Sequence, residues 1–481
     1  MDEMRELHLS GCPLTGTNLI EASAGTGKTY TIAALVLRLI LEADLAIGQI
    51  LVVTFTEAAT SELKDRIRRR ISEAAQAFAG GETGDTFLHQ LVERHPDAAA
   101  ARRKLDAALT NFDEASIFTI HGFCLRTLQD HAFAGGILFD AELVTDQRGI
   151  LREIVQDFWR EHFTRTSPLF HEYALTSGLS LENLQDLLNE KNVFNPHARI
   201  IPSADVPDCS AMETEFLRQF EETARAWTGA AEDIEAILST HPGLNRTSYR
   251  KGSIPGWIGI MDAMFSGECL SCKMDDSFLK FTSKSIEKAV KKGHAPPSHP
   301  IFHLCDRLAD AAERIQKAYD ERILGLKVKF LGRLHDELEK RKRSRNILFF
   351  DDLLLKLEAA LGGPGGDGLA EAIRGRFKAA LIDEFQDTDS IQYAIFSRIF
   401  GREVSTLFLI GDPKQAIYGF RGADIFAYMD ASRSASSRFT LGENWRSEPG
   451  LIEGVNTVFT NRENPFVHED IVFHPAKAAA G

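Results

Sequence analysis

Cysteine is scarce in this chain, with six residues among 481 and no regular spacing between them. A chain this long with so few cysteines is not built around disulfide bonds, and we expect reduced thiols, as in a cytoplasm. Long apolar runs are also missing, so no segment is predicted to cross a bilayer. The acidic start, MDEMRELHLS, is not a secretory signal. These absences predict a cytoplasmic protein without a membrane partner.

An excess of positive charge is missing as well, since the formal net charge is −14. Net charge does not exclude a nucleic-acid partner, because a local basic groove can bind phosphates on an otherwise acidic protein. Three segments are locally basic, at residues 64–70, 273–292 and 339–345. Such patterns are more often solvated helix faces than binding surfaces. Their position beside the motifs described below favours a binding role.

The length of the chain predicts two or three domains. Four apolar runs rich in β-branched residues are each followed by a polar loop, at residues 49–56, 116–128, 377–389 and 405–420. This pattern predicts an α/β fold with a mostly parallel sheet covered by helices. Ligands in such sheets bind outside the carboxyl ends of the strands, where these polar loops would lie.

The sequence pattern differs between residues 151 and 345, where long amphipathic segments are separated by loops. We interpret this stretch as a helical domain inserted into the sheet domain. The expected organisation is a discontinuous core of residues 1–150 and 346–440, an inserted helical domain of residues 151–345, and the start of another domain at residues 441–481.

A glycine-rich turn in residues 19–41 separates an apolar pair from a helical apolar stripe. It matches the phosphate-loop pattern G/A-x-x-x-x-G-K-[ST], with alanine in the first glycine position. Backbone N–H groups and a helix N-terminus bind phosphates in such loops. Lys28 would reach the β- and γ-phosphates of ATP, and the Thr29 hydroxyl would bind Mg²⁺. The residues predicted to bind the nucleotide here are Ala22, Ser23, Ala24, Gly25, Thr26, Gly27, Lys28 and Thr29.

Two carboxylates directly follow the third apolar run. Asp383 at the strand end is predicted to hold Mg²⁺, an ion that takes few protein oxygens. Glu384, one residue on, is predicted to orient and deprotonate the attacking water. A solvated acidic turn is the alternative, but a phosphate loop upstream in the same sheet favours the catalytic interpretation.

The fourth apolar run is followed by Asp412 and then by Gln415, which could sense hydrolysis beside a γ-phosphate. Exposed aromatic rings next to an arginine form a stacking platform for single-stranded bases. The candidate platform residues are Tyr418, Phe420 and Arg421. The two aromatic residues could instead belong to the core.

Six motifs occur in order between residues 21 and 447: EASAGTGKT, VVTFTEAAT, TIHGFC, LIDEFQDTD, LIGDPKQAIYGFRGAD and LGENWRS. With them the chain resembles superfamily 1 helicases of the UvrD/Rep type, and most closely the RecB (exodeoxyribonuclease V beta subunit) family. The resemblance implies a RecA-like P-loop NTPase core, ATP and Mg²⁺ as cofactors, and 3′-to-5′ movement along single-stranded DNA. It further implies a helicase–nuclease for recombinational double-strand break repair, with RecC-like and RecD-like subunits.

The resemblance also implies roles for single residues. Trp445, where the family usually has tyrosine, would stack on the adenine, and Arg446 would contact the γ-phosphate. Gln415 is similar to the family's glutamine near that phosphate. The inserted helical domain is similar to the one that meets duplex DNA, with residues 273–292 as a candidate contact. The residues that resemble single-strand contacts are Thr54, Phe55, Thr56, Thr119, His121 and Phe123.

Two departures from the family pattern matter. No clear adenine-reading glutamine motif precedes residue 22, and the chain stops about 35 residues after NWRS, before the later helicase motifs and any nuclease domain. Residues 441–481 would then begin a truncated second motor domain. We therefore expect an N-terminal portion of a longer protein, which alone binds nucleotide weakly and shows little or no DNA-stimulated hydrolysis.

Three alternatives stay open from the sequence. The chain could be a DNA- and partner-binding module without turnover, an AddA- or UvrD-type helicase, or a P-loop ATPase that acts on something other than nucleic acid. Cys269 and Cys272 form one C-x-x-C pair, but a zinc site would require a second tight ligand pair, and the nearby histidines are irregularly spaced.

Overall fold

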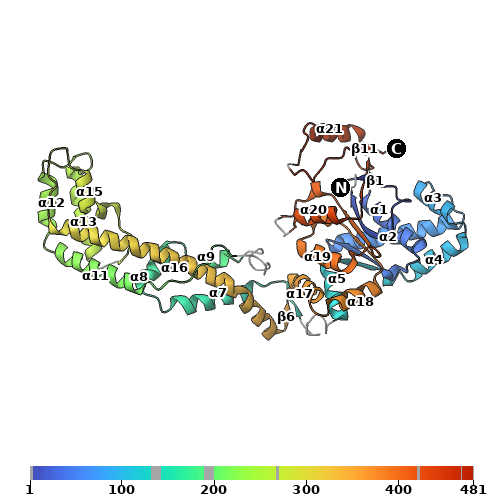
Figure 1. Cartoon of the computed structure of the whole chain (residues 1–481), viewed down its shortest axis with the longest axis horizontal. Helices are drawn as coiled ribbons and strands as arrows, with labels where there is room; N and C mark the ends of the chain where they lie inside the picture. The colour runs from blue at the N-terminus through green and yellow to red at the C-terminus, as the bar shows by residue number, and fades with distance from the viewer. Residues whose placement is uncertain are drawn as a thin grey trace. The chain divides into compact units, whose positions relative to one another are not determined.

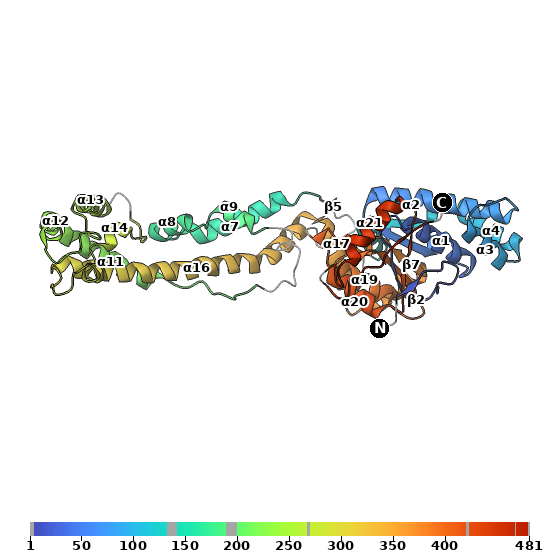
Figure 2. The same cartoon turned by 90° about the horizontal axis from the view of Figure 1, so that it is seen from above.

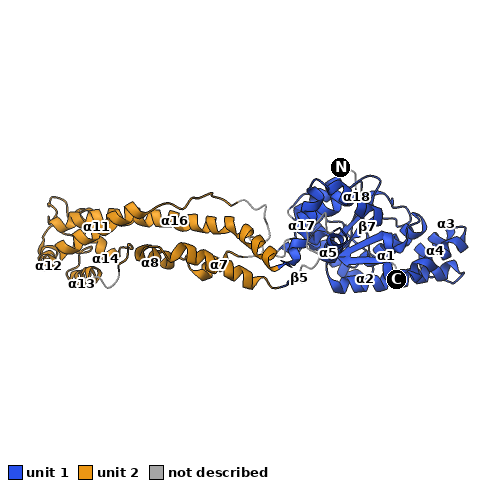
Figure 3. Ribbon diagram, turned by 90° about the horizontal axis from the view of Figure 1, so that it is seen from below, with its two compact units in different colours: residues 1–145, 346–481 blue, residues 146–345 orange. Residues whose placement is uncertain are grey.

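The computed structural model describes residues 4–131, 142–188, 200–266, 270–419, 423–466 and 468–479. The chain forms two compact units, drawn in blue and orange in Figure 3. Unit 1 comprises residues Met1–Thr145 and Asn346–Gly481, and unit 2 comprises residues Asp146–Arg345.

Unit 1 contains a seven-stranded sheet in which all paired strands run parallel, in the order β1-β9-β2-β8-β7-β3-β4. The strands are β1 (Arg5–Glu6), β2 (Gly16–Glu21), β3 (Ile50–Thr54), β4 (Ser116–Thr119), β7 (Ala379–Ile382), β8 (Thr406–Gly411) and β9 (Ser437–Thr440). The four apolar runs singled out in the sequence contain β3, β4, β7 and β8. The predicted α/β fold with a parallel sheet is confirmed.

Helices cover both faces of this sheet. Successive strand residues point to opposite faces, so Leu19 and Ile20 of β2 belong to two different hydrophobic cores. The Ile20 core includes α1 (Lys28–Leu41) and α2 (Glu57–Phe78). The Leu19 core includes α5 (Ile120–Asp130), α17 (Phe350–Gly362), α18 (Gly366–Arg376) and α19 (Ser390–Phe400). Near-continuous apolar runs are expected for strands buried on both faces.

The carboxyl ends of the central strands define the functional edge of the sheet. Because all the strands are parallel, β2, β8, β7 and β3 end at the same edge, at Glu21, Gly411, Ile382 and Thr54. The phosphate loop and the motifs after β3, β7 and β8 therefore meet there, although hundreds of residues separate them in the sequence.

Further elements of unit 1 flank the sheet. They are α3 (Thr86–Arg94), α4 (Ala98–Thr110), α20 (Ile425–Ser434), α21 (Pro449–Thr460), the short strands β5 (Glu142–Leu143) and β6 (Ile347–Leu348), and the parallel pair β10 (Glu443–Asn444) and β11 (Lys477–Ala478). Residues 441–479 lie in unit 1 in this structure. That they begin a second motor domain stays a prediction.

Unit 2 is helical. Its helices are α7 (Arg148–Phe163), α8 (Pro168–Thr176), α9 (Leu181–Asp186), α11 (Ser210–Trp227), α12 (Ala231–Thr240), α13 (Ile254–Phe265), α14 (Asp276–Leu279), α15 (Ser283–Lys288) and α16 (Pro300–Arg345). The 46-residue α16 packs along α7, α8 and α11 (Figures 1 and 2). Its buried stripe recurs at helical spacing and includes Leu308, Ile315, Phe330, Leu334 and Leu338.

No helix in the described part of the chain is both long enough and apolar enough to cross a membrane.

Candidate nucleotide and nucleic-acid site

The turn between β2 and α1 carries the predicted phosphate loop. Gly27, directly before Lys28 at the start of α1, has a left-handed backbone with φ 92°. Gly25 is left-handed as well, with φ 81°, and a Cβ atom there would lie 2.8 Å from Oδ1 of Asn444. Position 25 therefore requires glycine both for its backbone angle and for the close approach of Asn444. Backbone N–H groups in a turn of this kind can bind phosphate oxygens.

The segment after β9 lies against this loop. Nδ2 of Asn444 donates to the carbonyl oxygen of Ala24 at 2.9 Å, and the backbone N–H of Trp445 donates to the carbonyl of Gly25 at 2.9 Å. Trp445 is 67% exposed and Arg446 is exposed. Both residues therefore border the loop. Their contacts with adenine and with the γ-phosphate stay predictions.

The remaining loop residues are held locally. Ala22, in the first glycine position, is fully buried. The Thr26 hydroxyl donates to the carbonyl oxygen of Ser23 at 2.7 Å, closing the turn. Thr29, in the first turn of α1, is half-buried.

Lys28 and Glu384 form an ion pair. Nζ of Lys28 lies 2.7 Å from Oε2 of Glu384, with side-chain exposures of 15% and 34%. Glu384 follows β7 with a left-handed backbone, φ 51°, which is uncommon for a residue with a Cβ atom. Backbone strain of this kind is concentrated at functional sites. The pair joins the predicted phosphate-binding lysine to the predicted general base, 356 positions apart.

Asp383 lies directly beside this ion pair in the chain. Its backbone N–H donates to the carbonyl of Val53 at 2.8 Å, and its Oδ1 is buried without a hydrogen-bond partner among the described residues. Burial and the neighbouring Glu384 carboxylate raise the pKa of Asp383 from 3.8 to about 6, against the opposing charge of Lys28. The orphaned oxygen and the half-buried Thr29 hydroxyl are hard oxygen ligands of the kind that Mg²⁺ prefers, so these residues fit that ion.

Metal binding at Asp383 should depend on pH. A carboxyl group whose pKa is raised on folding stabilises the fold below its ordinary pKa, and this contribution is lost as the pH rises through the folded value. Relative to Asp383→Asn, we expect the metal-free wild type to lose stability between pH 3.8 and about 6. Because a proton competes with the ion, Mg²⁺ affinity should fall by up to about tenfold per pH unit below that value.

Thermal melts of both proteins between about pH 3.5 and 7 measure the first effect, and Mg²⁺ titrations between about pH 5 and 8 measure the second. Asp387 must be replaced by Asn in parallel, because burial and Glu384 raise its pKa to about 6 as well. A Mg²⁺ affinity that does not change across this range would contradict the assignment.

Gln386 connects Glu384 to the end of β8. Its Nε2 donates to Oε2 of Glu384 at 2.7 Å, and its Oε1 accepts from the backbone N–H of Asp412 at 2.9 Å. Gln386 is 2% exposed. It therefore contacts the predicted general base on one side and the residue after β8 on the other.

Asp412 accepts two further side-chain contacts. Nε2 of Gln415 donates to its Oδ2 at 2.7 Å, and Nζ of Lys414 lies 2.8 Å from its Oδ1. Lys414 also pairs with Glu21, the last residue of β2. A continuous series of polar contacts, here called the polar chain, thus runs from one end of the phosphate loop to the other. Its members are Lys28, Glu384, Gln386, Asp412, Lys414 and Glu21.

Three members of the polar chain were not predicted from the sequence: Glu21, Gln386 and Lys414. A usable signal existed for Glu21, because a carboxylate at the end of an apolar strand is costly to bury unless it is paired. Its partner could not be identified from the pattern, since Lys414 lies 393 positions away.

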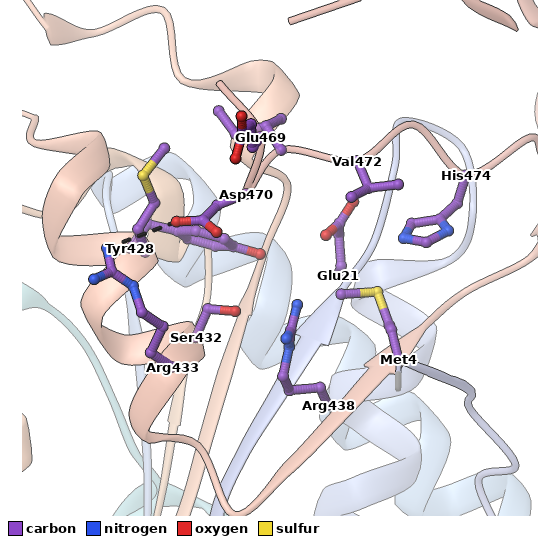
Figure 4. Close-up of a pocket in the computed structure, with 12 residues that line it drawn as sticks. Met4, Glu21, Tyr428, Ser432, Arg433, Arg438, Glu469, Asp470, Val472 and His474 are labelled. Carbon is purple, nitrogen blue, oxygen red and sulfur yellow. Dashed lines mark ion pairs between the residues drawn. The ribbon is translucent and has the colours of Figure 1, made fainter. Parts of the chain in front are cut away.

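A cavity of about 270 Å³ lies beside Glu21, between β2, β9, α20 and the C-terminal segment of unit 1. Tyr428 and Arg438 line it together with Glu21 (Figure 4). The Tyr428 hydroxyl and Nε of Arg438 are buried without a hydrogen-bond partner in the described part of the chain. Arg433, at the same cavity, pairs with Asp470 at 3.7 Å. Glu21 therefore borders this cavity as well as contacting Lys414.

Phe55 and Tyr418 come together as a stacked pair. Their ring centroids are 6.1 Å apart with an interplanar angle of 19°, and both residues are half-buried. The pair joins the motif after β3 to the motif after β8. The other two residues of the predicted platform, Phe420 and Arg421, lie outside the described residues.

Three of the other predicted strand contacts lie at helix starts or beside them. The hydroxyl of Thr56 caps α2 by accepting from Ala59, and that of Thr119 caps α5 by accepting from Gly122. His121 is half-buried, with its ring centroid 5.9 Å from that of Phe350. Their contacts with DNA stay predictions.

Two predicted contacts are buried in this conformation, and their direct contact with DNA stays a prediction. Thr54 is fully buried at the end of β3, and Phe123 is 1% exposed. The Phe123 ring packs between Phe377 and Phe396, with ring centroids 6.2 and 5.6 Å away. On the amphipathic α5, this position faces the core, so Phe123 supports the fold beneath the site.

Replacement of Phe123 by alanine should therefore lower the free energy of unfolding by about 3–5 kcal/mol, the usual cost of removing a core phenylalanine. Chemical denaturation measures this loss. The matched control is Phe426→Ala, since Phe426 is 60% exposed and should change stability by less than about 0.5 kcal/mol. A reduced affinity for single-stranded DNA at unchanged stability would instead support Phe123 as a DNA contact.

The three basic segments are partly neutralised. Arg70 is 8% exposed and pairs with Asp85 at 2.7 Å. In unit 2, Lys284 pairs with Asp310 at 2.7 Å. The third segment pairs with α7, through contacts of Arg341 and Arg345 to Glu153 and of Arg341 to Asp157. Part of this charge is therefore paired with carboxylates of the same chain.

The C-x-x-C pair is only partly visible. Cys269 lies outside the described residues, and Cys272 is fully buried, so that desolvation raises the pKa of its thiol to about 12. Among the described residues there is no group of three or more histidine, cysteine or acidic side chains that could hold a metal ion.

The chain matches a known protein family. The family model described as "UvrD/REP helicase N-terminal domain" matches residues 5–436. "RecBCD enzyme subunit RecB" of Escherichia coli (strain K12) is 38% identical over 479 residues, which cover 97% of this chain and 40% of that protein. The proteins of the same name from Haemophilus influenzae and Mycobacterium tuberculosis (strain H37Rv) are 38% and 29% identical, over 96% and 95% of this chain. The chain spans 41% and 30% of their lengths. The predicted resemblance to RecB-type helicases is confirmed.

Proposed function

We propose, from the premise that this chain belongs to the UvrD/REP helicase family, that it forms the first motor domain of an ATP-driven DNA helicase. The specific proposal is a 3′-to-5′ translocase subunit of a RecBCD-type helicase–nuclease for recombinational double-strand break repair, with RecC-like and RecD-like partners. One observation carries the ATP-driven part of this proposal: Lys28 of the phosphate loop lies 2.7 Å from Glu384, directly beside Asp383 with its orphaned oxygen. The direction of movement, the repair role and the partners rest on the family resemblance.

The residues of the phosphate loop would bind ATP. The backbone of residues 22–27 and the Lys28 ammonium would hold the phosphates, while Asp383 and Thr29 would hold Mg²⁺. The ion, when bound, offsets the negative charge that develops on the phosphates during transfer. In this structure Glu384 Oε2 accepts from both Lys28 and Gln386. Phosphates that bind Lys28 would release this oxygen, leaving Glu384 able to accept a proton from the attacking water.

The exposed edge beyond β3 and β8 would bind single-stranded DNA. The stacked Phe55 and Tyr418 rings support this assignment, because aromatic faces accept bases without sequence preference. The proposed role of Gln415 beside the γ-phosphate would link DNA contacts to the nucleotide. Unit 2 is the proposed duplex-contacting domain, with residues 273–292 as the candidate surface.

The test measures nucleotide binding and single-strand binding by this chain, because little DNA-stimulated hydrolysis is expected of it alone. Strand affinity should weaken steeply with salt because phosphate contacts release counterions. Tyr418→Ala should cost about 1–3 kcal/mol of binding, whereas the matched control Phe426→Ala, an exposed aromatic on α20, should cost nothing.

The outcomes separate the alternatives. Nucleotide binding without strand binding would favour a P-loop ATPase that acts on something else. Strand binding without nucleotide binding would favour a binding module without turnover. That this chain alone shows little DNA-stimulated hydrolysis stays a prediction of the sequence.

A further inference from the structure

Lys414 is a largely buried lysine between two buried carboxylates. Its side chain is 9% exposed, and those of its partners Glu21 and Asp412 are 6% and 3% exposed. Burial by itself would lower the pKa of Lys414, but the two carboxylates outweigh it and raise the pKa. The ammonium is therefore charged, and removing it would leave two buried carboxylates without this partner.

Lys414 connects the carboxyl ends of the neighbouring strands β2 and β8. Glu21 closes β2 directly before the phosphate loop and pairs in the sheet with Gly411, the last residue of β8. Asp412 follows Gly411. Lys414 thus connects the entrance of the phosphate loop to the residue after β8.

Asp412 in turn orients Gln415. Nε2 of Gln415 donates one hydrogen to Oδ2 of Asp412 at 2.7 Å, which leaves its second hydrogen for another acceptor. The Asp412 carboxylate is itself held by Lys414 through its other oxygen, at 2.8 Å. The direction of the Gln415 amide therefore depends on Lys414 through one intermediate residue.

We propose that Lys414 is a positioning residue that aims Gln415 at the γ-phosphate and so makes the site prefer ATP to ADP. This inference rests on the proposed function, because it assigns a task to Gln415 within that site. ADP has no γ-phosphate for Gln415 to contact. Loss of Lys414 should therefore affect ATP and leave ADP nearly unchanged.

The experiment measures the affinity of this chain for Mg·ADP and for a non-hydrolysable Mg·ATP analogue by calorimetry. Lys414→Met should weaken the analogue about tenfold, the typical effect of one charge-assisted hydrogen bond, and change ADP less than about twofold. Gln415→Ala should give the same loss, and the double variant should lose no more than either single one. The matched control is Lys104→Met, a surface lysine paired with Asp44 at 2.7 Å, with both affinities unchanged.

Lys414→Met leaves Glu21 without its ammonium partner and could fail to fold. Glu21→Gln/Lys414→Met removes the opposing charge as well, while Asp412 keeps the backbone N–H of Lys414 as a partner. Equal losses of both nucleotides in this double variant would indicate a purely structural ion cluster and overturn the inference. An unchanged ratio of ATP to ADP affinity would overturn it as well.

Failure of the proposed function is distinguishable. Wild type that binds neither nucleotide, or Lys28→Ala that binds both like wild type, would overturn that function and this inference together. Binding that requires Lys28 but does not respond to Lys414 or Gln415 would overturn only the inference.

Discussion

Lys28→Ala should reduce Mg·ATP affinity by a factor of about 100 or more, because it removes a cation that forms charge-assisted hydrogen bonds with phosphate oxygens. The fold should persist. The ion pair that Lys28 forms with Glu384 is partly exposed, so its loss costs only about 1 kcal/mol of folding free energy. Calorimetric titration with Mg·ATP measures the first effect, and thermal denaturation measures the second.

The matched control for this variant is Lys104→Ala on α4. Lys104 also pairs with a carboxylate in unit 1, that of Asp44, but lies on the surface away from the sheet edge. Its replacement should leave nucleotide affinity unchanged. Wild-type affinity in Lys28→Ala would contradict the assignment of the phosphate loop to the nucleotide site. Weakened nucleotide binding in both variants would indicate a nonspecific effect of charge.

Asp383→Ala and Glu384→Gln should separate metal binding from proton transfer, although the two residues are adjacent. Asp383→Ala should lose both Mg²⁺-dependent nucleotide binding and hydrolysis, because it removes the orphaned oxygen. Glu384→Gln should slow hydrolysis by about 10²–10⁴-fold, the usual contribution of a general base. Its affinity for Mg·ATP should equal or exceed that of wild type, because nucleotide binding no longer has to break the 2.7 Å ion pair between Lys28 and Glu384.

Single-turnover hydrolysis of labelled ATP resolves even slow rates, and calorimetry gives the affinities. Asp367→Asn is the matched control, since this carboxylate is 77% exposed at the surface of unit 1 and should change neither quantity. Weaker ATP binding in Glu384→Gln than in wild type would show that Glu384 supports the ion rather than the water.

The sequence carried enough information to place the strands and the loop chemistry. Near-continuous apolar runs mark strands buried on both faces, and the phosphate-loop pattern specifies its own turn through two glycines with positive φ. Asp383 and Glu384 were identifiable because both follow an apolar run directly. In these cases the residues that matter are neighbours in the chain, so their order determines their geometry.

Other features depended on distant residues. Whether Phe123 faces the core or the solvent is decided by the helices that pack on the same sheet face, and its own motif does not reveal them. The stacking of Phe55 on Tyr418 likewise requires two segments far apart in the sequence to end at one edge. Such contacts follow from strand order, which no single segment encodes.

Local periodicity and spacing are enough to predict a parallel α/β core with a phosphate loop, and they identify Asp383 and Glu384 as the carboxylates after β7. The position of Lys414 between Glu21 and Asp412, and the ion pair of Lys28 with Glu384, could not be predicted in this way. Lys414 and Glu21 are 393 positions apart in the sequence, and Lys28 and Glu384 are 356 positions apart. They meet because β2 lies beside β8, and β8 beside β7, in a sheet whose strands all end on one side.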